Sequence, residues 1–584
     1  MKGSIFSALA LVVGSLATTI PHRAHKTSLY PRQSSNSSCE HGPKSRKCWG
    51  DYSIDTDWYQ ETPPGKLEER WLSIEEGPCS PDGYERHCMT FNGTIPGPTI
   101  IANWGDELVI HVTNNMKNNG TAVHWHGVRQ LGSLLADGVP GVTQCPIAPG
   151  ETMTYRFNVT QYGSAWYHSH FSLQYSEGLF GGIVFKGPAT ADYDVDLGNL
   201  FLQDWSHIES FAVWEKSVKK GFPPSLDTGL INGTNTKACS ETIDPKCAAA
   251  GPGKKFETIF ESGTKYLLRL VNSAADGVFQ FSIDGHNLTV IANDFVPIEP
   301  YVTDSVQLTV GQRYDVIVEA NAEPGNYWLR SGWLAGCALN MNPTSMTGIV
   351  RYKADTADPE TTSTVVPSGH CLDEPFEKTV PHLKLDAAAP SITYEQLNFN
   401  TSGGLWKWTL NSSSLKLDWK NPTMKTIFDG KSVFPTEYNV VGVDRTAGTN
   451  TSQWAALVIQ DTASAGPDHP IHLHGHDFWV LDRSSGKGTF DFANTKFNLK
   501  NPTRRDVATL PNGGYLVIAF KLDNPGAWLV HCHIAWHASQ GLSLEFVEDQ
   551  SLISIGQEAK TDFDNTCKSW SLFTPIWEQD DSGI

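Results

Sequence analysis

Residues 531–537 have the sequence HCHIAWH, in which one cysteine lies between two histidines and a third histidine follows. If the preceding residues form a strand, alternation directs His531 and His533 to one face and Cys532 to the other. The thiolate can then bind one metal ion while the flanking imidazoles bind different ions behind it. Thiolate together with imidazole suits copper, iron or zinc, and one cysteine with two histidines and a weak or absent axial ligand is the blue-copper arrangement. The stretch therefore predicts a copper site; the alternative is a buried cysteine among structural histidines.

Three other segments carry a His-X-His signature: HWHG at 124–127, HSH at 168–170 and HPIHLHGH at 469–476. A single pair is weak evidence, because such pairs also occur on exposed strands. Four clusters in one chain argue against that explanation, and zinc alone does not need so many histidines. The four segments resemble the four copper-binding motifs of the multicopper oxidases. The surrounding sequence is similar to that of secreted laccases of the ascomycete type.

The resemblance implies four copper ions: one of type 1, one of type 2 and two of type 3. It assigns the type 1 copper to Cys532, His469 and His537, and the type 2 copper to His124 and His472. It assigns one type 3 ion to His126, His168 and His533, and the other to His170, His474 and His531. Only the resemblance separates the two type 3 sets, because spacing cannot. His476 falls outside this pattern, and we expect it beside the ligands.

The ligand layout predicts an electron path. Electrons enter one at a time at the type 1 site and pass through the thiolate and backbone of Cys532 into His531 and His533. These two histidines contact the trinuclear cluster, where dioxygen is taken to water. Because one tripeptide touches both sites, the path is covalent and short.

Three further residues are expected to tune the chemistry. Asp137, in ADGV, matches a carboxylate that resembles a proton donor near the type 2 copper; its alternative is an Asp-Gly turn. Asp276 matches an acidic residue of the substrate pocket in related laccases, where it would accept the phenolic proton; its alternative is a solvated turn. Leu542 stands five positions after His537, where some relatives place methionine. Leucine has no lone pair, so we expect a three-coordinate type 1 copper of raised potential.

An internal repeat predicts the domain organisation. GSAWYHSH at 163–170 aligns with PGAWLVHCH at 525–533, and HWHG at 124–127 aligns with HLHG at 472–475. A degenerate copy, SIDG at 282–285 and PGNYW at 324–328, lacks the histidines. Short alternating segments between Pro-Gly and Gly-rich turns are typical of β-sandwiches. We therefore expect an all-β chain, and the resemblance implies three cupredoxin-like Greek-key domains, the outer two sharing a metal cluster and the middle one serving as a spacer.

The ends of these domains follow from composition. Residues 1–19 contain a short apolar run typical of a signal peptide, and residues 20–37 are polar, basic and serine-rich like a propeptide or disordered arm. The three domains are expected at 38–195, 196–370 and 371–584, the last including a linker and a C-terminal tail. No later segment is long and apolar enough for a membrane helix. We expect a secreted, extracellular protein.

Cysteines and glycosylation signals agree with export. Of 11 cysteines, Cys532 is claimed by copper, which leaves an even number for an oxidising compartment. The pairs close in sequence are 39–48, 79–88, 239–247 and 337–371, which leaves Cys145 and Cys567; related laccases have a similar bridge, although sequence alone does not determine connectivity. Asn-X-Ser/Thr signals occur at Asn36, Asn92, Asn119, Asn158, Asn232, Asn287, Asn400, Asn411 and Asn450.

The net charge of −19 and the absence of a basic run argue against nucleic acid or an anionic membrane as partner. The resemblance implies a laccase that oxidises phenols and aromatic amines with dioxygen, and we expect a monomer. The alternatives are another multicopper oxidase, such as an ascorbate oxidase or a ferroxidase, and a cupredoxin that only stores copper or transfers electrons. A full trinuclear ligand set disfavours the last, because storage needs no dioxygen site.

The chain ends in Asp581-Ser582-Gly583-Ile584, which resembles the end of mature ascomycete laccases. The resemblance implies that this tail enters a channel leading to the trinuclear coppers. A disulfide between residues 145 and 567 would restrict the positions that the end of the tail can reach, and this would lower the conformational entropy cost of docking the tail. The alternative is a frayed terminus.

Overall fold

The computed structural model describes residues 39–237, 246–247, 251, 253–352, 357–388, 390–402, 404–445, 453–463, 466–573 and 579–584. The predicted signal peptide at 1–19 and arm at 20–37 lie outside these residues. No helix in the described part of the chain is long and apolar enough to cross a membrane.

The first sandwich consists of two four-stranded sheets. One has the order β4 (Arg86–Phe91), β3 (Leu67–Cys79), β6 (Glu107–Asn114) and β8 (Thr152–Asn158). The other has the order β5 (Gly97–Asn103), β10 (Phe180–Lys186), β9 (Gly163–Ser169) and β7 (Val123–His126). A separate apolar core lies between them, because β8 alternates buried Met153, Tyr155 and Phe157 with more exposed residues.

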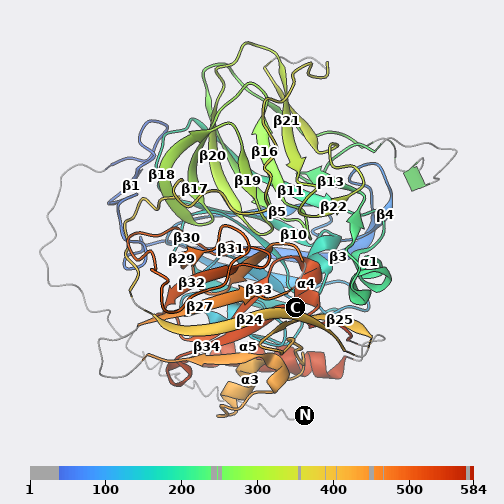
Figure 1. The fold of residues 1–584 in the computed structure, drawn as a ribbon, viewed down its shortest axis with the longest axis vertical. Helices are drawn as coiled ribbons and strands as arrows, with labels where there is room; N and C mark the ends of the chain where they lie inside the picture. Colours follow the sequence, from blue (N-terminus) through green and yellow to red (C-terminus); the bar gives the residue numbers. More distant parts are fainter. Residues whose placement is uncertain are drawn as a thin grey trace, which may run out of the picture. The chain divides into compact units, whose positions relative to one another are not determined.

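The second sandwich is larger and lies in the middle of the sequence (green in Figure 1). One sheet has the order β13 (Thr228–Ile231), β11 (Val195–Trp205), β15 (Lys265–Asn272), β20 (Arg313–Glu319), β17 (Leu288–Asn293) and β18 (Val296–Thr303). The other has the order β14 (Glu257–Ile259), β23 (Thr347–Arg351), β21 (Asn326–Trp333), β16 (Phe279–Ile283) and β19 (Val306–Leu308).

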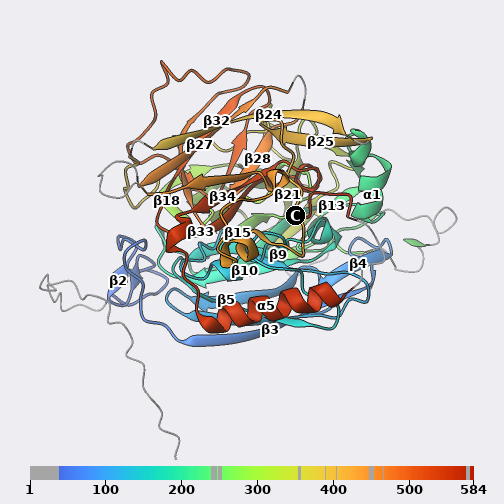
Figure 2. The same cartoon turned by 90° about the horizontal axis from the view of Figure 1, so that it is seen from below.

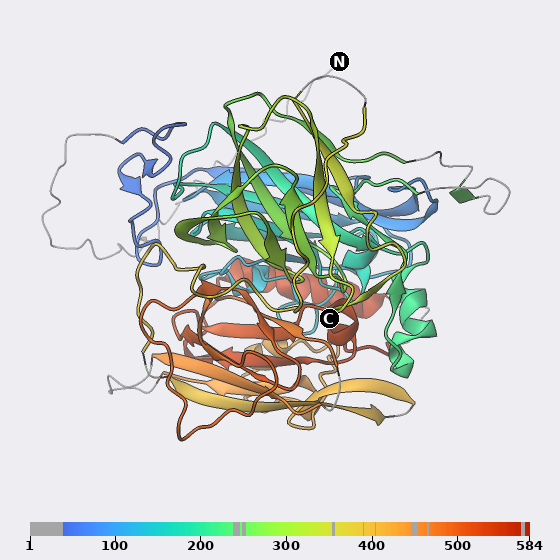
Figure 3. The ribbon, with the colours of Figure 1, turned by 45° about the horizontal axis from the view of Figure 1, so that its top comes forward.

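The third sandwich forms a group of its own (yellow to red in Figure 3). One sheet has the order β25 (Leu405–Leu410), β24 (Ser391–Ser402), β27 (Trp454–Asp461), β32 (Tyr515–Lys521), β29 (Phe478–Arg483) and β30 (Arg504–Arg505). The other has the order β26 (Val440–Val443), β34 (Ser543–Glu548), β33 (Gly526–Cys532), β28 (His469–Leu473) and β31 (Val507–Leu510).

Strand pairing repeats in all three sandwiches. The parallel pairs are β3–β6, β11–β15 and β24–β27 in one sheet of each, and β5–β10, β14–β23 and β26–β34 in the other. The antiparallel pair β7–β9 corresponds to β16–β21 and to β28–β33. The degenerate copy in the sequence is therefore a domain of the same topology without metal ligands. The prediction of an all-β chain of three cupredoxin-like domains is confirmed.

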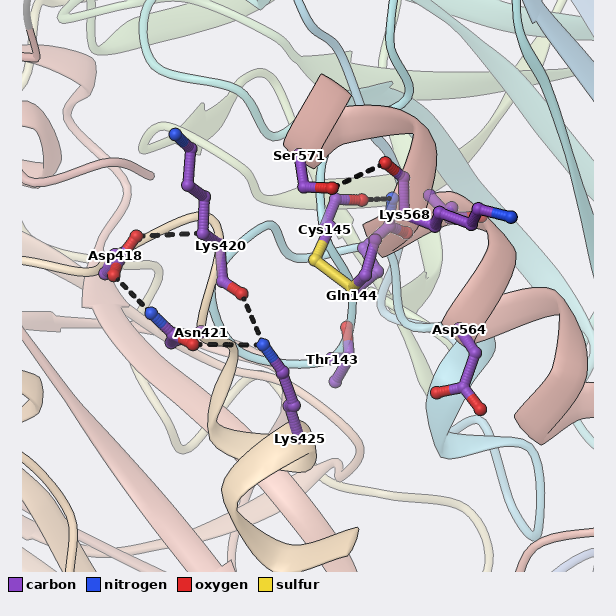
Figure 4. The surroundings of a disulfide bond; sticks show 12 residues. Thr143, Gln144, Cys145, Asp418, Lys420, Asn421, Lys425, Asp564, Lys568 and Ser571 are labelled. Carbon is purple, nitrogen blue, oxygen red and sulfur yellow. Dashed lines mark hydrogen bonds between the residues drawn. A yellow bond between two sulfur atoms is a disulfide. The ribbon is translucent and has the colours of Figure 1, made fainter. Parts of the chain in front are cut away.

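Three of the described helices are short: α1 (Ser210–Lys216), α3 (Thr423–Phe428) and α4 (Ala535–Ser539). α5 (Gln557–Leu572) is longer, as Figure 2 shows, and it contacts β8 of the first domain. It buries Phe563 and Trp570, and a Cys145–Cys567 disulfide joins it to the first domain (Figure 4).

The predicted disulfides 39–48, 79–88, 337–371 and 145–567 are all present. The remaining predicted pair, 239–247, involves Cys239, which lies outside the described residues. Cys532 is a free, buried cysteine, as a metal ligand must be.

Candidate copper centres

Three donors come together at one edge of the third domain. His469 begins β28, Cys532 ends β33, and His537 lies in α4. Cys532 Sγ lies 3.7 Å from His469 Nδ1 and 3.4 Å from His537 Nδ1, and the two nitrogens are 3.1 Å apart. The turn into α4 brings His537 back toward the cysteine only five residues later. The three side chains can therefore hold one metal ion.

The surroundings of these donors suit a bound cation. Cys532 and His469 are fully buried, whereas His537 keeps an exposed edge. Burial raises the pKa of the Cys532 thiol and lowers the pKa of His469 to about 3. A thiolate is therefore unfavourable here unless a metal cation balances its charge.

Leu542 lies next to this site and is only 1% exposed. Its backbone N–H donates to the His537 carbonyl at 3.0 Å, and its carbonyl accepts the Cys532 N–H at 3.1 Å. The residue is thus tied to two of the three donors and offers no side-chain ligand atom.

The eight other predicted ligand histidines gather between the first and third domains. His124 lies opposite His168 in the β7–β9 pair, and His472 lies opposite His531 in the β28–β33 pair, the same register in both domains. The imidazoles of the two domains interleave: ring centroids are 3.9 Å apart for His124 and His474 and for His126 and His472. The groups able to hold an ion include His124, His126 and His168; His124, His472 and His474; and His170, His474 and His531.

His533, the remaining predicted ligand, joins this cluster through His126. Its Nε2 lies 3.2 Å from His126 Nδ1, just as His531 Nε2 lies 3.3 Å from His474 Nε2. The two histidines that flank Cys532 therefore both face the cluster, while the cysteine side chain faces the other site. The structure brings all eleven predicted donors into two sites.

Unpaired nitrogens show that the cluster fits copper. Among the described residues, Nε2 of His124, His168 and His472 has no hydrogen-bond partner although each is buried. A buried polar atom without a partner is costly, and a metal ion satisfies it. Burial also lowers the pKa of His168, His472 and His474 well below the ordinary value, so these rings are neutral and able to ligate. Imidazole with one thiolate is a donor set that suits copper.

Two aspartates orient the histidines in a matching way. The Asp137 carbonyl accepts the Nδ1–H of His124 at 2.7 Å, and its carboxylate accepts the Nδ1–H of His474 at 2.9 Å. The Asp506 carbonyl accepts the Nδ1–H of His472 at 2.7 Å, and its carboxylate lies 3.2 Å from His126 Nε2. Each aspartate thus leaves the opposite ring nitrogen free for metal, which is how neighbours of a metal site select a tautomer.

Asp506 and Trp408 were missed by the sequence reasoning. Asp506 follows Arg504 and Arg505 directly before the buried strand β31, and a charged run at the edge of a core strand is a signal for buried ion pairs. Trp408 packs on the type 1 site, with its ring centroid 4.9 Å from His469 and 4.8 Å from His537. No local signal marks this tryptophan.

Asp276 lies near the exposed edge of the type 1 site. The Ala535 N–H donates to the Ala275 carbonyl at 2.8 Å, which joins this loop to the segment after Cys532. Asp276 lines a small pocket with Pro470 and Ile534. Burial, with a smaller contribution from the Asp204 carboxylate, raises the pKa of Asp276 to about 8, while Trp536 favours its ionised form.

His476 contributes to none of the groups able to hold an ion among the described residues. Its Nε2 lies 3.0 Å from a carboxylate oxygen of Glu548, and its ring packs on Phe520 at 4.9 Å. It therefore stabilises the strands behind the ligands.

The C-terminal tail, residues 581–584, is bound to helix α4. The Ser582 N–H donates to Ser539 O at 2.8 Å and its hydroxyl to Ala538 O at 2.7 Å, both in α4, and Ile584 is 3% exposed. The Asp581 carboxylate contacts the Ser172 hydroxyl, two residues after His170, and burial raises the pKa of Asp581 to about 6. The tail thus connects the helix carrying His537 to the loop carrying His170.

Sequence models of the multicopper oxidases match residues 73–190, 198–355 and 411–551. The chain belongs to the multicopper oxidase family. It is 54% identical to Laccase-2 of Botryotinia fuckeliana over 585 residues, covering 100% of this chain and 99% of that protein. It is 41% identical to dihydrogeodin oxidase of Aspergillus terreus, covering 98% and 99%.

Solved structures of multicopper oxidases have the same fold as this chain. The laccase from Botrytis aclada superposes with a TM-score of 0.90 at 55% identity, covering 94% of this chain and 100% of that one. Fet3p, a multicopper oxidase that functions in iron import, superposes with a TM-score of 0.74 at 28% identity, covering 89% and 99%. The family and these relatives imply four coppers per chain, one type 1, one type 2 and two type 3.

Proposed function

We propose that this chain is a secreted laccase that oxidises phenols and aromatic amines by one electron at a time and reduces dioxygen to water. The observation that carries the proposal is the position of Cys532. Its sulfur belongs to the outer site, and its two neighbours, His531 and His533, belong to the inner cluster. When bound, the coppers supply the one-electron redox chemistry and the dioxygen site.

The residues define how electrons travel. Only His537 of the three type 1 donors has an exposed edge, so a substrate ring meets the protein there. From Cys532 the path to His531 runs through one peptide unit. It also has a parallel branch, because His531 Nδ1–H donates to the Cys532 carbonyl at 2.9 Å. Leu542 offers no ligand atom, and a copper held by the three donors alone would favour the reduced state and a high potential.

The residues also supply routes for protons. Asp276 is the base for the phenolic proton, since it lies beside the segment that carries His537 and has a pKa of about 8. Asp137 lies at the trinuclear side and contacts two histidines of the cluster, where four-electron reduction consumes protons. The docked tail holds the Asp581 carboxylate against the Ser172 hydroxyl, two residues after His170, and from there it would deliver protons toward the cluster.

We propose in addition that the protein is secreted and monomeric. Its domains would span residues 38–195, 196–370 and 371–584. Disulfides support an oxidising compartment. The charge of −19 disfavours nucleic acid and anionic membranes as partners.

Oxygen uptake by the copper-loaded protein tests the proposal. A phenol or an aromatic amine should sustain rapid uptake with no peroxide released, while ascorbate and ferrous iron should be poorer donors. A ferrous-iron rate above the phenol rate would favour a ferroxidase. Bound copper without uptake on any donor would favour storage or electron transfer.

A further inference from the structure

The copper-free middle domain reaches the trinuclear cluster with a single turn. This turn joins β19 to β20 and contains Gly311, whose φ is +87°. A Cβ at Gly311 would lie 2.9 Å from His533 Cδ2 and 3.2 Å from His126 Cε1. The backbone of the middle domain is therefore packed directly on one imidazole from each outer domain. A domain that only separated the other two would not need such contact.

The first charged residue after Gly311 is Arg313, which begins β20 and is completely buried. Its guanidinium forms a two-pronged ion pair with Asp506 of the third domain, with Nη1–Oδ1 at 2.5 Å and Nη2–Oδ2 at 2.6 Å. Its Nε donates to the Ser164 carbonyl on β9 of the first domain at 3.2 Å. One side chain thus connects all three domains at the cluster.

The ion pair determines where the Asp506 carboxylate can point. Oδ1 of Asp506 accepts from Arg313 and also lies 3.2 Å from His126 Nε2, so rotation of the carboxylate would break both contacts. The peptide of the same residue binds His472. Planar, two-point pairing is specific to arginine, since lysine offers only a point charge. Burial disfavours the charge of Arg313, but Asp506 and Asp294 favour it and the net effect raises its pKa.

The ion pair is closely packed by the backbone of the first domain. Gly127, directly after His126, has a φ of +80°, and a Cβ there would clash with Arg313 Nη2 and lie 2.6 Å from Asp506 Oδ2. The equivalent carboxylate, Asp137, has no arginine partner among the described contacts; its oxygens face only histidines, with Oδ2 2.9 Å from His474 Nδ1 and Oδ1 3.3 Å from His124 Nδ1. The two aspartates that orient the cluster are therefore held differently, because only Asp506 is paired with an arginine.

We propose that Arg313 of the middle domain is a positioning residue for the trinuclear copper centre, acting through Asp506 on His126 and His472. The middle domain is then part of the construction of the site and not a spacer. The inference rests on the proposed function, because it needs copper at these histidines.

The test replaces Arg313 with lysine, which keeps the charge and loses the two-pronged pairing. Arg269→Lys is the matched control: Arg269 is a buried arginine on the neighbouring strand β15, paired with Asp196 and Asp315, and it also donates to the Ser164 hydroxyl. Among the described contacts it makes no hydrogen bond or ion pair with a predicted ligand or with Asp506. Copper per chain is measured after dialysis against graded chelator. The electron paramagnetic resonance of the type 2 copper and the near-ultraviolet band of the type 3 pair are recorded alongside. The blue type 1 absorption, from donors of the third domain alone, reports correctly folded protein.

For Arg313→Lys we expect about tenfold to a hundredfold weaker retention of the cluster coppers. We also expect altered type 2 and type 3 spectra, with an unchanged blue band, and wild-type behaviour in Arg269→Lys. Wild-type retention and spectra in Arg313→Lys would overturn the proposal.

Arg313→Gln provides a second, uncharged variant in case lysine prevents folding. If neither Arg313 variant gives blue protein while Arg269→Lys does, Arg313 is a general folding requirement and the proposal is also overturned. Wild-type protein that fails to bind four coppers would instead refute the proposed function, which separates the two failures.

Discussion

Replacing Asp276 with asparagine tests proton acceptance at the substrate edge. Because the pKa of Asp276 is about 8, the carboxylate is about half ionised at pH 8 and about 1% ionised at pH 6. If the base contributes about a hundredfold when ionised, the rate ratio of wild type to Asp276→Asn is about fifty at pH 8, ten at pH 7 and two at pH 6. The ratio should therefore rise with pH.

The assay is initial oxygen uptake between pH 5 and pH 8, with a phenol and with a non-phenolic one-electron donor. The non-phenolic donor has no proton to lose, so the ratio of the wild-type rate to the Asp276→Asn rate should stay near one over the whole pH range with this donor. Asp304→Asn, at an exposed aspartate of the same domain, is the control for loss of charge. A phenol ratio independent of pH, or an equal loss on both donors, would refute the role of Asp276.

The raised pKa also has a consequence for stability. The unfolded chain releases this proton near the ordinary value of 3.8, whereas the folded protein holds it until about pH 8. Between these two pH values the folded state binds more protons than the unfolded state. The wild type should therefore lose stability relative to Asp276→Asn as the pH rises. Thermal midpoints of both proteins at pH 4 and pH 8 measure this difference, and a constant difference would contradict the shifted pKa.

Three further predictions follow from the copper sites and the tail. Cys532→Ser should lose the blue absorption and turnover while the trinuclear histidines still bind copper by metal analysis; a blue, active variant would contradict the ligand assignment. Leu542→Met should lower the type 1 potential in a redox titration at a packing cost below about 1.5 kcal/mol, and an unchanged or higher potential would exclude an axial position. Deleting residues 581–584 should slow reoxidation by dioxygen in stopped flow while the blue band stays normal, and a wild-type rate would make the tail a passive end.

The architecture was predictable because its signals are local or periodic. Residues 163–170 and 525–533 repeat one strand, and alternation within 531–533 alone predicts that the cysteine and the histidines face different sites. The register of β7–β9 and β28–β33 then reproduces the same geometry in both outer domains. All eleven donors identified from the sequence are brought together, since each lies within a few residues of a regular strand.

The supporting residues were not predictable in the same way. Asp506 lies 380 positions from His126, and Arg313 lies 193 positions from Asp506, so no window of sequence contains the pair. Asp276 was predicted as a proton acceptor, but its raised pKa depends on burial and on Asp204, which folding brings beside it. The middle domain was predicted as a spacer, because it carries no ligand; its contact with the cluster appears only in three dimensions.

Its resemblance to the multicopper oxidases implied the metal and the number of ions, and the sequence by itself determined the candidate donors, the repeated sandwich and the direct link between the two centres. These depend on donor chemistry and on the two-residue period of a strand, both of which are written in short segments. Only the tertiary structure decided which carboxylates orient the imidazoles, what holds those carboxylates, and which histidine meets the solvent. These depend on burial and on charge pairing across domains, and both arise only when distant segments exclude water together.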